Sequence, residues 1–180
     1  MLIQIDKLKR RPRQIELEKQ ASSFPVLAEM VVEQSVTFDE SITGSLEVSW
    51  VGDFIKVSGH LATLVSTPCC RCLAPVSTRL DVSVLLTYVS AEEGEATHDD
   101  ELELHADEMD LIHFSGPELD LLPDVEQEIV MSLPQQPLCK ASCLGLCHSC
   151  GCNLNQDRCN CEAPILHPGL AALKNFKIKI

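Results

Sequence analysis

The stretch CLGLCHSCGCNLNQDRCNC, residues 143–161, holds six of the ten cysteines in this 180-residue chain. Within it, a short loop separates the pairs Cys147-x2-Cys150 and Cys159-x-Cys161. A C-x2-C turn places two thiolates on one side of a tight bend, from which both can reach a tetrahedral Zn²⁺ at about 2.3 Å. The segment is poor in large apolar residues, so metal binding would supply its folding free energy. The spacing therefore predicts a zinc ion held by these four thiolates, with Cys152 outside the site.

Two further cysteine pairs predict a second site. Cys69-x2-Cys72 lies between two segments with strand character, and Cys139-x3-Cys143 comes just before the first site. Each pair supplies half of a tetrahedral site, and together they would complete one. The spacing does not decide which pairs share an ion, and it leaves open an exposed thiol cluster without metal. On the metal hypothesis the chain binds two zinc ions, and Cys70 is spare.

Other uses of the thiols have weaker support in the sequence. There is no apolar signal-peptide region and no run of about 18 apolar residues, so we expect a cytoplasmic protein without membrane contact, where disulfides are rare. PCCRC matches one half of a zinc deaminase signature, but the H-x-E half is missing. Ferredoxin, nucleophile-elbow and P-loop motifs are also missing. We expect no enzyme and no small-molecule substrate. The alternative is a thiol-based redox or metal-handling protein.

The elements that must position these cysteines indicate an α+β fold. Residues 42–50 alternate apolar and polar side chains, which is typical of a half-buried strand, and 54–66 and 76–90 also have strand character. Apolar residues three or four apart predict an amphipathic helix over 118–132. We expect a mainly antiparallel sheet with one principal helix and a zinc-stabilised, Cys-rich C-terminal segment. The expected domains are 1–133, with an acidic loop and the helix, and 134–180. Short strands at 2–5, 27–34 and 101–105 and a last helix at 168–175 complete the prediction.

Charge is unevenly distributed along the chain. The net charge of −13 argues against electrostatic binding of nucleic acid by the chain as a whole. No Lys or Arg lies between Arg79 and Lys140, so this acidic interval predicts either a solvated loop or a surface for a basic partner. The partner surface would include Glu118, Glu126 and Glu128. A single dense basic patch near the start offers a possible RNA contact, made by Lys7, Lys9, Arg10, Arg11 and Arg13.

Three features occur in order along the chain: C-x2-C between strands, the acidic helix DLLPDVEQEIVMSLP, and PLCKASCLGLCHSCGCNLNQDRCNC. This combination resembles the YceD family, the large ribosomal RNA subunit accumulation proteins. The resemblance implies a non-enzymatic factor that supports synthesis, processing or stability of large-subunit (23S-type) ribosomal RNA. With the charge distribution, we expect the partner to be a basic ribosomal protein or a large-subunit assembly particle. Ribosomal RNA would then be affected indirectly.

Overall fold

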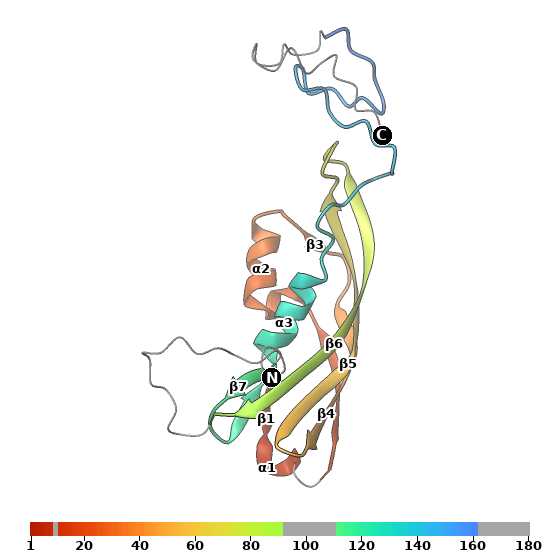
Figure 1. Cartoon of the computed structure of the whole chain (residues 1–180). Helices are drawn as coiled ribbons and strands as arrows, with labels where there is room; N and C mark the ends of the chain where they lie inside the picture. The colour runs from red at the N-terminus through yellow and green to blue at the C-terminus, as the bar shows by residue number, and fades with distance from the viewer. Residues whose placement is uncertain (9–10, 92–110, 162–180) are drawn as a thin grey trace, which may run out of the picture. The chain divides into compact units, whose positions relative to one another are not determined.

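The computed structural model describes residues 1–8, 11–91 and 111–161 (Figure 1). The chain divides into two compact units. The first, here the sheet unit, comprises Met1–Thr67 and Ser77–Gln135. The second, here the cysteine unit, comprises Pro68–Val76 and the residues from Gln136 onward. The cysteine unit therefore draws on two segments that are far apart in the sequence.

The sheet unit is built on a six-stranded sheet with the order β2-β4-β5-β6-β7, in which β3 also pairs with β5. The pairs β2/β4, β3/β5 and β4/β5 are antiparallel, whereas β7 runs parallel to β6. A separate two-stranded sheet pairs β1 with β8 in antiparallel register. The mainly antiparallel α+β fold is thus confirmed. The strands are β1 (Leu2–Gln4), β2 (Arg13–Lys19), β3 (Thr37–Phe38), β4 (Ile42–Val51), β5 (Phe54–Pro68), β6 (Pro75–Ser90), β7 (Leu111–Phe114) and β8 (Glu118–Asp120).

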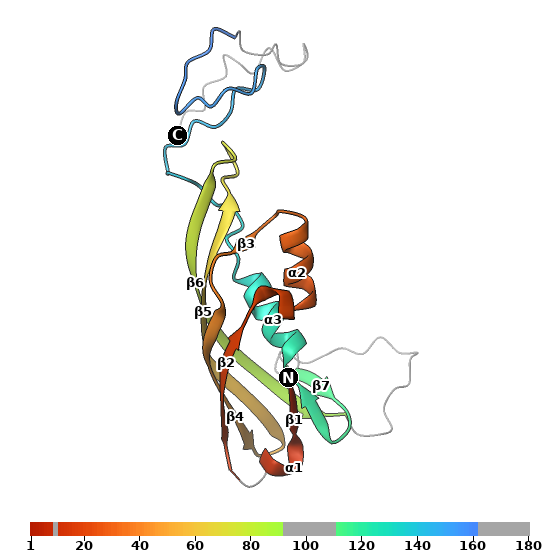
Figure 2. The same cartoon turned by 180° about the vertical axis from the view of Figure 1, so that it is seen from behind.

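Helices α2 (Pro25–Val32) and α3 (Leu122–Met131) lie on the same side of the six-stranded sheet (Figures 1 and 2). The helix α1 (Ile5–Leu8) and the 3₁₀ turn η1 (Ala21–Ser23) are short. Along much of β4, β5 and β6, buried residues alternate with more exposed ones, which is the two-residue period of a strand with one covered face. None of the described helices is long and apolar enough to cross a membrane. The core includes Leu46, Val57, Leu61, Val84, Leu86, Val125 and Ile129.

The close approach of β4 and β5 depends on two glycines. A Cβ atom added to Gly44 would lie 2.1 Å from the carbonyl oxygen of His60, and one added to Gly59 would lie 2.1 Å from that of Ser45. Real Cβ atoms do not come so near a carbonyl oxygen. The two glycines therefore permit an unbroken register between these central strands.

The structure corrects two expectations about the elements. The strand expected over 27–34 is wrong, because α2 occupies this segment with Pro25 in its first turn, where the fixed φ of proline suits a helix. The principal helix starts at Leu122 rather than at 118, because Glu118–Asp120 form β8 and pair with β1. The strand near 2–5 is confirmed as β1. The elements expected at 101–105 and 168–175 lie outside the described residues.

Candidate metal centres

The two segments of the cysteine unit bring together four thiols, here called the hairpin centre. Cys69 and Cys72 lie in the turn between β5 and β6, and Cys139 and Cys143 come from the segment after α3. The four sulfur atoms all lie within 4.8 Å of one another. Cys69 Sγ is 3.9 Å from Cys143 Sγ, and Cys72 Sγ is 3.5 Å from Cys139 Sγ. The structure thus brings together the two pairs that sequence spacing left unassigned.

Local hydrogen bonds shape the turn that carries the first pair. The backbone N–H of Leu73 donates to the Cys69 carbonyl at 3.0 Å, and Leu73 has a φ of 60°, in the left-handed region. The Cys69 N–H donates to the Ala74 carbonyl at 2.8 Å. These bonds bend the chain tightly, so that Cys69 and Cys72 both present their thiols to the same point.

Arg71 connects the turn to the second segment. Its Nη1 donates to the Cys143 carbonyl at 2.9 Å, and its own carbonyl accepts from the N–H of Leu146 at 3.1 Å. Gly145, with a φ of 78°, passes so close that an added Cβ would lie 3.1 Å from the Arg71 carbonyl oxygen. These contacts hold Cys143 beside the turn even though the two segments are far apart along the chain.

A second group of four thiols, here called the terminal centre, forms within residues 147–159. The sulfur atoms of Cys147, Cys150, Cys152 and Cys159 all lie within 4.8 Å of one another. The Gly151 N–H donates to the Cys147 carbonyl at 2.8 Å, and the Cys147 N–H donates to the Cys152 carbonyl at 2.8 Å. Gly151 adopts a φ of 73°, which a residue without a side chain reaches most easily. The C-x2-C turn therefore forms as its sequence predicts.

The terminal centre differs from the sequence prediction at one position. Cys152, expected to stand outside the site, belongs to the group of four, and Cys161 does not. The Cys161 thiol nevertheless interacts with those of Cys150, Cys147 and Cys159. Sequence spacing favoured Cys161 because it forms a second close pair with Cys159. In the structure, the Cys147 N–H donates to the Cys152 carbonyl, and this bend brings the thiol of Cys152 into the group.

Backbone amides favour a thiolate in each centre. Hydrogen bonds from the backbone of Cys139 and Arg71 lower the pKa of the Cys69 thiol to about 6. Hydrogen bonds from the backbone of Cys150 and Ser149 likewise lower the pKa of Cys147 to about 6. The thiol of Cys139 donates to the neighbouring sulfur of Cys72, which raises the pKa of Cys139 to about 12. Each group thus concentrates negative charge and shares its remaining protons, which a divalent cation would displace.

The donor atoms and their spacing fit zinc. A tetrahedral ion with Zn–S bonds of about 2.3 Å requires sulfur atoms about 3.8 Å apart, from tetrahedral geometry. The sulfur–sulfur distances of 3.9 and 3.5 Å in the hairpin centre lie on either side of this value. All ten cysteines are free thiols. The two groups of four could therefore each hold a metal ion with purely sulfur ligation.

Asn155 supports the hairpin centre from the loop of the terminal centre. Its Nδ2 donates to Cys143 Sγ at 3.3 Å, and its Oδ1 accepts from the N–H of Leu144 at 3.0 Å. A side-chain amide that donates to a thiolate orients it and stabilises its charge. Sequence spacing alone does not single out Asn155. A polar residue within a cysteine loop was the available signal for this further role.

The basic residues near the start gather around a shallow hollow of about 290 Å³ in the sheet unit. Lys7, Arg11 and Arg13 line this hollow, and all three are exposed. Lys9 and Arg10 lie outside the described residues. The three described cations form no ion pair with described carboxylates, so their charges are available to an anionic ligand.

The three acidic residues predicted to face a partner have different environments. Glu118, on β8, is exposed, and Glu128, on α3, is half-buried. Glu126 corrects the prediction, because it is only 5% exposed and its Oε1 accepts hydrogen bonds from the N–H groups of Val26 at 2.6 Å and Leu27 at 3.0 Å. Its carboxylate thus caps the N-terminus of α2, where the helix dipole and free N–H groups favour negative charge.

A groove of about 590 Å³ runs beside Glu128 in the sheet unit. Leu111 and Ile112 of β7 line it together with Gln127 and Met131 of α3. The Met131 side chain is 63% exposed, so the groove presents apolar surface to solvent. Glu128 adds a carboxylate to this wall.

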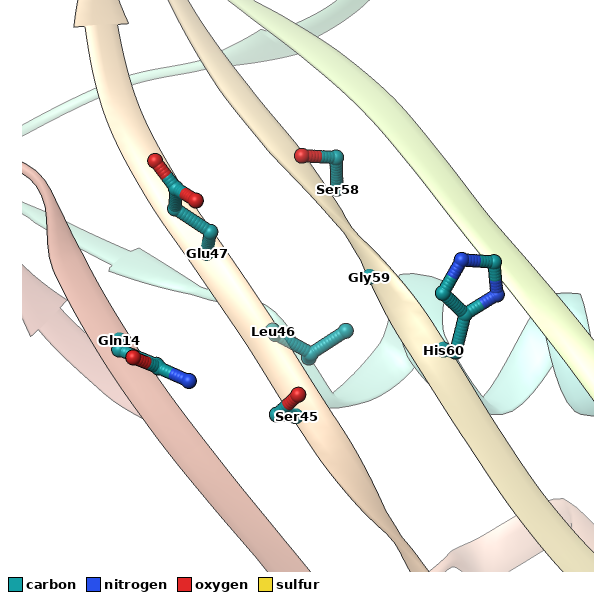
Figure 3. A pocket seen from close by; sticks show the side chains of 7 residues that line it. All are labelled: Gln14, Ser45, Leu46, Glu47, Ser58, Gly59 and His60. Carbon is teal, nitrogen blue, oxygen red and sulfur yellow. The ribbon is translucent and has the colours of Figure 1, made fainter.

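The face of the sheet opposite the helices carries another hollow, of about 300 Å³ (Figure 3). Its lining comes from β2, β4 and β5 and is mostly polar. The Glu47 carboxylate and the His60 ring lie on opposite sides of Gly59 in Figure 3, while His60 Nδ1 is 3.3 Å from Ser83 Oγ. These side chains do not converge on one point, so the hollow has no paired acid and base.

Comparison with known proteins identifies the family. The model of a family described as "Large ribosomal RNA subunit accumulation protein YceD" matches residues 57–177, about two thirds of the chain. Uncharacterised proteins of Mycobacterium bovis and Mycobacterium tuberculosis are each 32% identical over 112 residues, covering 59% of this chain and 48% of theirs. A third, from Mycobacterium leprae, is 28% identical over 162 residues, covering 86% of this chain and 67% of its own.

The chain thus spans about half the length of the first two relatives. No solved structure matches it. The family match includes most of β5, all of β6 and α3, and the cysteines of both centres. By this match, the chain belongs to the YceD family of large ribosomal RNA subunit accumulation proteins.

Proposed function

We propose that this protein supports the accumulation of large-subunit (23S-type) ribosomal RNA as a binding factor in large-subunit assembly. The family match over residues 57–177 carries the proposal. The test is removal of the gene, followed by measurement of mature large-subunit RNA relative to small-subunit RNA. We expect the ratio to fall and to recover when the intact gene is restored. An unchanged ratio would contradict the proposal.

Binding rather than catalysis is supported by the chemistry of the two centres. Each supplies four thiol groups, and four thiolates fill the coordination sphere of a tetrahedral zinc ion. Catalytic zinc sites keep a position for water or substrate, whereas structural sites are closed. We therefore propose that the metal stabilises the cysteine unit and that the protein acts through its surfaces.

We propose two zinc ions per chain, one in each centre. Native mass spectrometry of protein purified under reducing conditions should show both ions. Replacement of Cys147 and Cys150 by Ser should remove one ion and leave the hairpin centre occupied, because the hairpin thiols form their own group. Protein without metal, or iron with a visible charge-transfer spectrum, would contradict this proposal.

For the partner, we propose a basic ribosomal protein or an assembly particle that contains one. The support comes from the groove beside Glu128, where exposed apolar surface adjoins negative charge. A segment rich in Lys or Arg with an apolar anchor would match both properties. Residues 80–139 contain no Lys or Arg whose positive charge would repel such a partner.

A pull-down at rising salt tests the partner proposal. The variant combines Glu118→Gln and Glu128→Gln and leaves Glu126 intact because of its structural role. Glu16→Gln with Glu18→Gln is the matched control, since both residues are exposed on β2, at the other edge of the sheet from β7. We expect the variant with Glu118→Gln and Glu128→Gln to recover less large-subunit protein than the wild type, most clearly at low salt, and the control to recover as much as the wild type. Equal recovery by both variants, or recovery that RNase abolishes, would contradict it.

A direct RNA contact would use the basic hollow of Lys7, Arg11 and Arg13. Each phosphate contact contributes about 0.9 to the slope of log affinity against log salt on duplex nucleic acid. Neutralising the three residues should therefore flatten the slope by at most about 2.7. Lys56→Ser, at an exposed site on β5, is the control. If the protein affects RNA only through its protein partner, the salt slope of RNA binding should be the same in the variant with all three residues neutralised as in the wild type.

A thiol-based redox role is the alternative, and Cys70 is the observation in its favour. This thiol is exposed and belongs to neither centre. A redox function requires a pair of thiols that cycles reversibly to a disulfide. Thiol titration before and after mild oxidation separates the proposals, because structural zinc protects its thiolates and leaves the hairpin centre unreactive.

A further inference from the structure

The hairpin centre and the terminal centre are neighbours within the cysteine unit and share backbone hydrogen bonds. Only residues 144–146 separate the last cysteine of the hairpin centre from the first cysteine of the terminal centre. The N–H of Leu154 donates to the Gly145 carbonyl at 3.0 Å, and Leu146 forms an isolated antiparallel bridge with Asn153. The loop of the terminal centre is therefore bonded to the short connection between the two centres.

The same connection is also bonded to the turn of the hairpin centre. The N–H of Leu146 donates to the Arg71 carbonyl at 3.1 Å, and Arg71 Nη1 donates to the Cys143 carbonyl at 2.9 Å. Residues 144–146 thus contact structural parts of both centres at once. A change in the fold of one centre has a direct path to the other through these three residues.

Asn155 extends this connection to a ligand sulfur. It belongs to the loop between Cys152 and Cys159 of the terminal centre, yet its Nδ2 donates to Cys143 Sγ of the hairpin centre at 3.3 Å. Its Oδ1 accepts from the N–H of Leu144 at 3.0 Å, and because a backbone N–H only donates, this bond fixes which end of the amide faces the sulfur. An amide donates more strongly to a thiolate than to a neutral thiol.

The position of Asn155 depends on the fold of its own loop. Its backbone N–H donates to Asn153 Oδ1 at 3.0 Å, and its Nδ2 donates to the same oxygen at 2.8 Å. Leu154 is the one large apolar residue between Cys152 and Cys159, so this loop has little hydrophobic stabilisation. An ion bound by Cys152 and Cys159 would fix both ends of the loop and so hold the turn that orients Asn155.

We propose that the two centres bind zinc cooperatively and that Asn155 couples them. The inference rests on the proposed zinc content. An ion in the terminal centre orders the loop and places the Asn155 amide at Cys143. An ion in the hairpin centre makes Cys143 a thiolate, which the amide binds more strongly. Each thiol that binds zinc releases its proton to solvent, and no electron transfer occurs. Because such coupling is reciprocal, each ion raises the affinity for the other by the same factor.

Zinc competition with a chelator of known affinity, under reducing conditions, measures the coupling in the full chain. The hairpin centre is measured alone in the variant with Cys147→Ser and Cys150→Ser. The terminal centre is measured alone in the variant with Cys69→Ser and Cys72→Ser. We expect the wild-type affinity for both ions together to exceed the product of the two separate affinities by about 10–100-fold, the usual effect of a hydrogen-bond partner of a metal ligand. Native mass spectra of partly loaded wild type should show less one-zinc chain than independent sites would give.

Variants at Asn155 keep every thiol and test its role separately. Asn155→Ala should still bind two ions at saturating zinc but lose the coupling. Asn155→Asp keeps an acceptor for Leu144 but replaces the donor to Cys143 Sγ with an oxygen, so it should lose the coupling as well. Gln156→Ala is the matched control and should keep the coupling. Gln156 is exposed in the same loop, and only its backbone N–H takes part in the described hydrogen bonds.

The outcomes separate this inference from the proposed zinc content. Wild-type protein that binds two ions independently would overturn the coupling and leave the two-zinc proposal intact. Equal coupling in Asn155→Ala, Asn155→Asp and the wild type would overturn the role of Asn155. Wild-type protein that binds no zinc, or one ion only, would overturn both the coupling and the two-zinc proposal.

Discussion

At the residue scale, Glu126 shows that an acidic side chain in an acidic region can have a structural role. Its carboxylate on α3 accepts from two backbone N–H groups in the first turn of α2. Val26 and Glu126 are 100 residues apart in the sequence. The two helices that cover the sheet are therefore connected by a buried charge at a helix N-terminus, which is a favourable place for it.

We predict that Glu126→Ala lowers the free energy of unfolding by about 2–3 kcal/mol, because it leaves one buried and one partly buried N–H donor without an acceptor. Urea unfolding followed by the fluorescence of Trp50, the chain's one tryptophan, measures this change in the sheet unit. Glu126→Gln, which keeps an acceptor oxygen, should cost less. Glu128→Ala on the same helix should change stability by no more than about 0.5 kcal/mol. Equal losses at positions 126 and 128 would contradict the capping role.

At the element scale, the pairing of β4 with β5 keeps the central strands of the sheet unit in register. β5 ends at Pro68, one residue before Cys69 in the sequence. The register runs without interruption from Val51 and Phe54 to Thr43 and Ala62. Gly44 and Gly59 allow this register, because any side chain there would meet the backbone of the partner strand.

We predict that Gly59→Ala lowers the free energy of unfolding by about 1–3 kcal/mol or more, since the added methyl group must push the strands apart. The control is Gly52→Asn in the turn between β4 and β5. Gly52 has a φ of 61° and no atom within 4 Å of an added Cβ, and asparagine tolerates this backbone region. Thermal unfolding of the two variants side by side measures the difference. If Gly59→Ala melts no lower than Gly52→Asn, the close-approach argument is wrong.

At the scale of the whole molecule, the two units are stabilised by different interactions. The sheet unit has a continuous apolar core, in which each fully buried Val, Leu or Ile side chain contributes about 1.5–3 kcal/mol. In the cysteine unit, the buried cluster consists of Cys69, Cys72 and Cys143 with a few small or partly buried apolar neighbours. Such a cluster supplies little hydrophobic free energy, so under the proposed metal binding the ions would supply much of the folding free energy of this unit.

We predict that a chelator under reducing conditions unfolds the cysteine unit and leaves the sheet unit folded. Hydrogen exchange should show protection lost at the amides of Leu73 and Leu146, which are hydrogen-bonded within the cysteine unit. The amides of the central strands β4 and β5 should stay protected. Added zinc should restore the lost protection. Simultaneous loss in both units would show that the sheet unit also depends on the metal.

Local features of the sequence determined much of this protein. The C-x2-C pairs at Cys69 and Cys147 form as predicted, because each turn closes through backbone hydrogen bonds between residues close in the sequence. The long strands follow from their two-residue apolar period, which one covered face of a sheet requires. The order of the helix and the cysteines along the sequence also predicted family membership, and the family match confirms it.

Only the tertiary structure decided which distant residues meet. Cys69 and Cys143 are 74 residues apart, and no spacing rule relates them. The strand expected over 27–34 is a helix, because the short apolar run fits either form and the buried Glu126 of α3 supplies the N-terminal cap. The place of Cys152 in the terminal centre depends on the fold of its loop. Local spacing constrains a few backbone angles, whereas these contacts depend on how segments far apart in the sequence pack together.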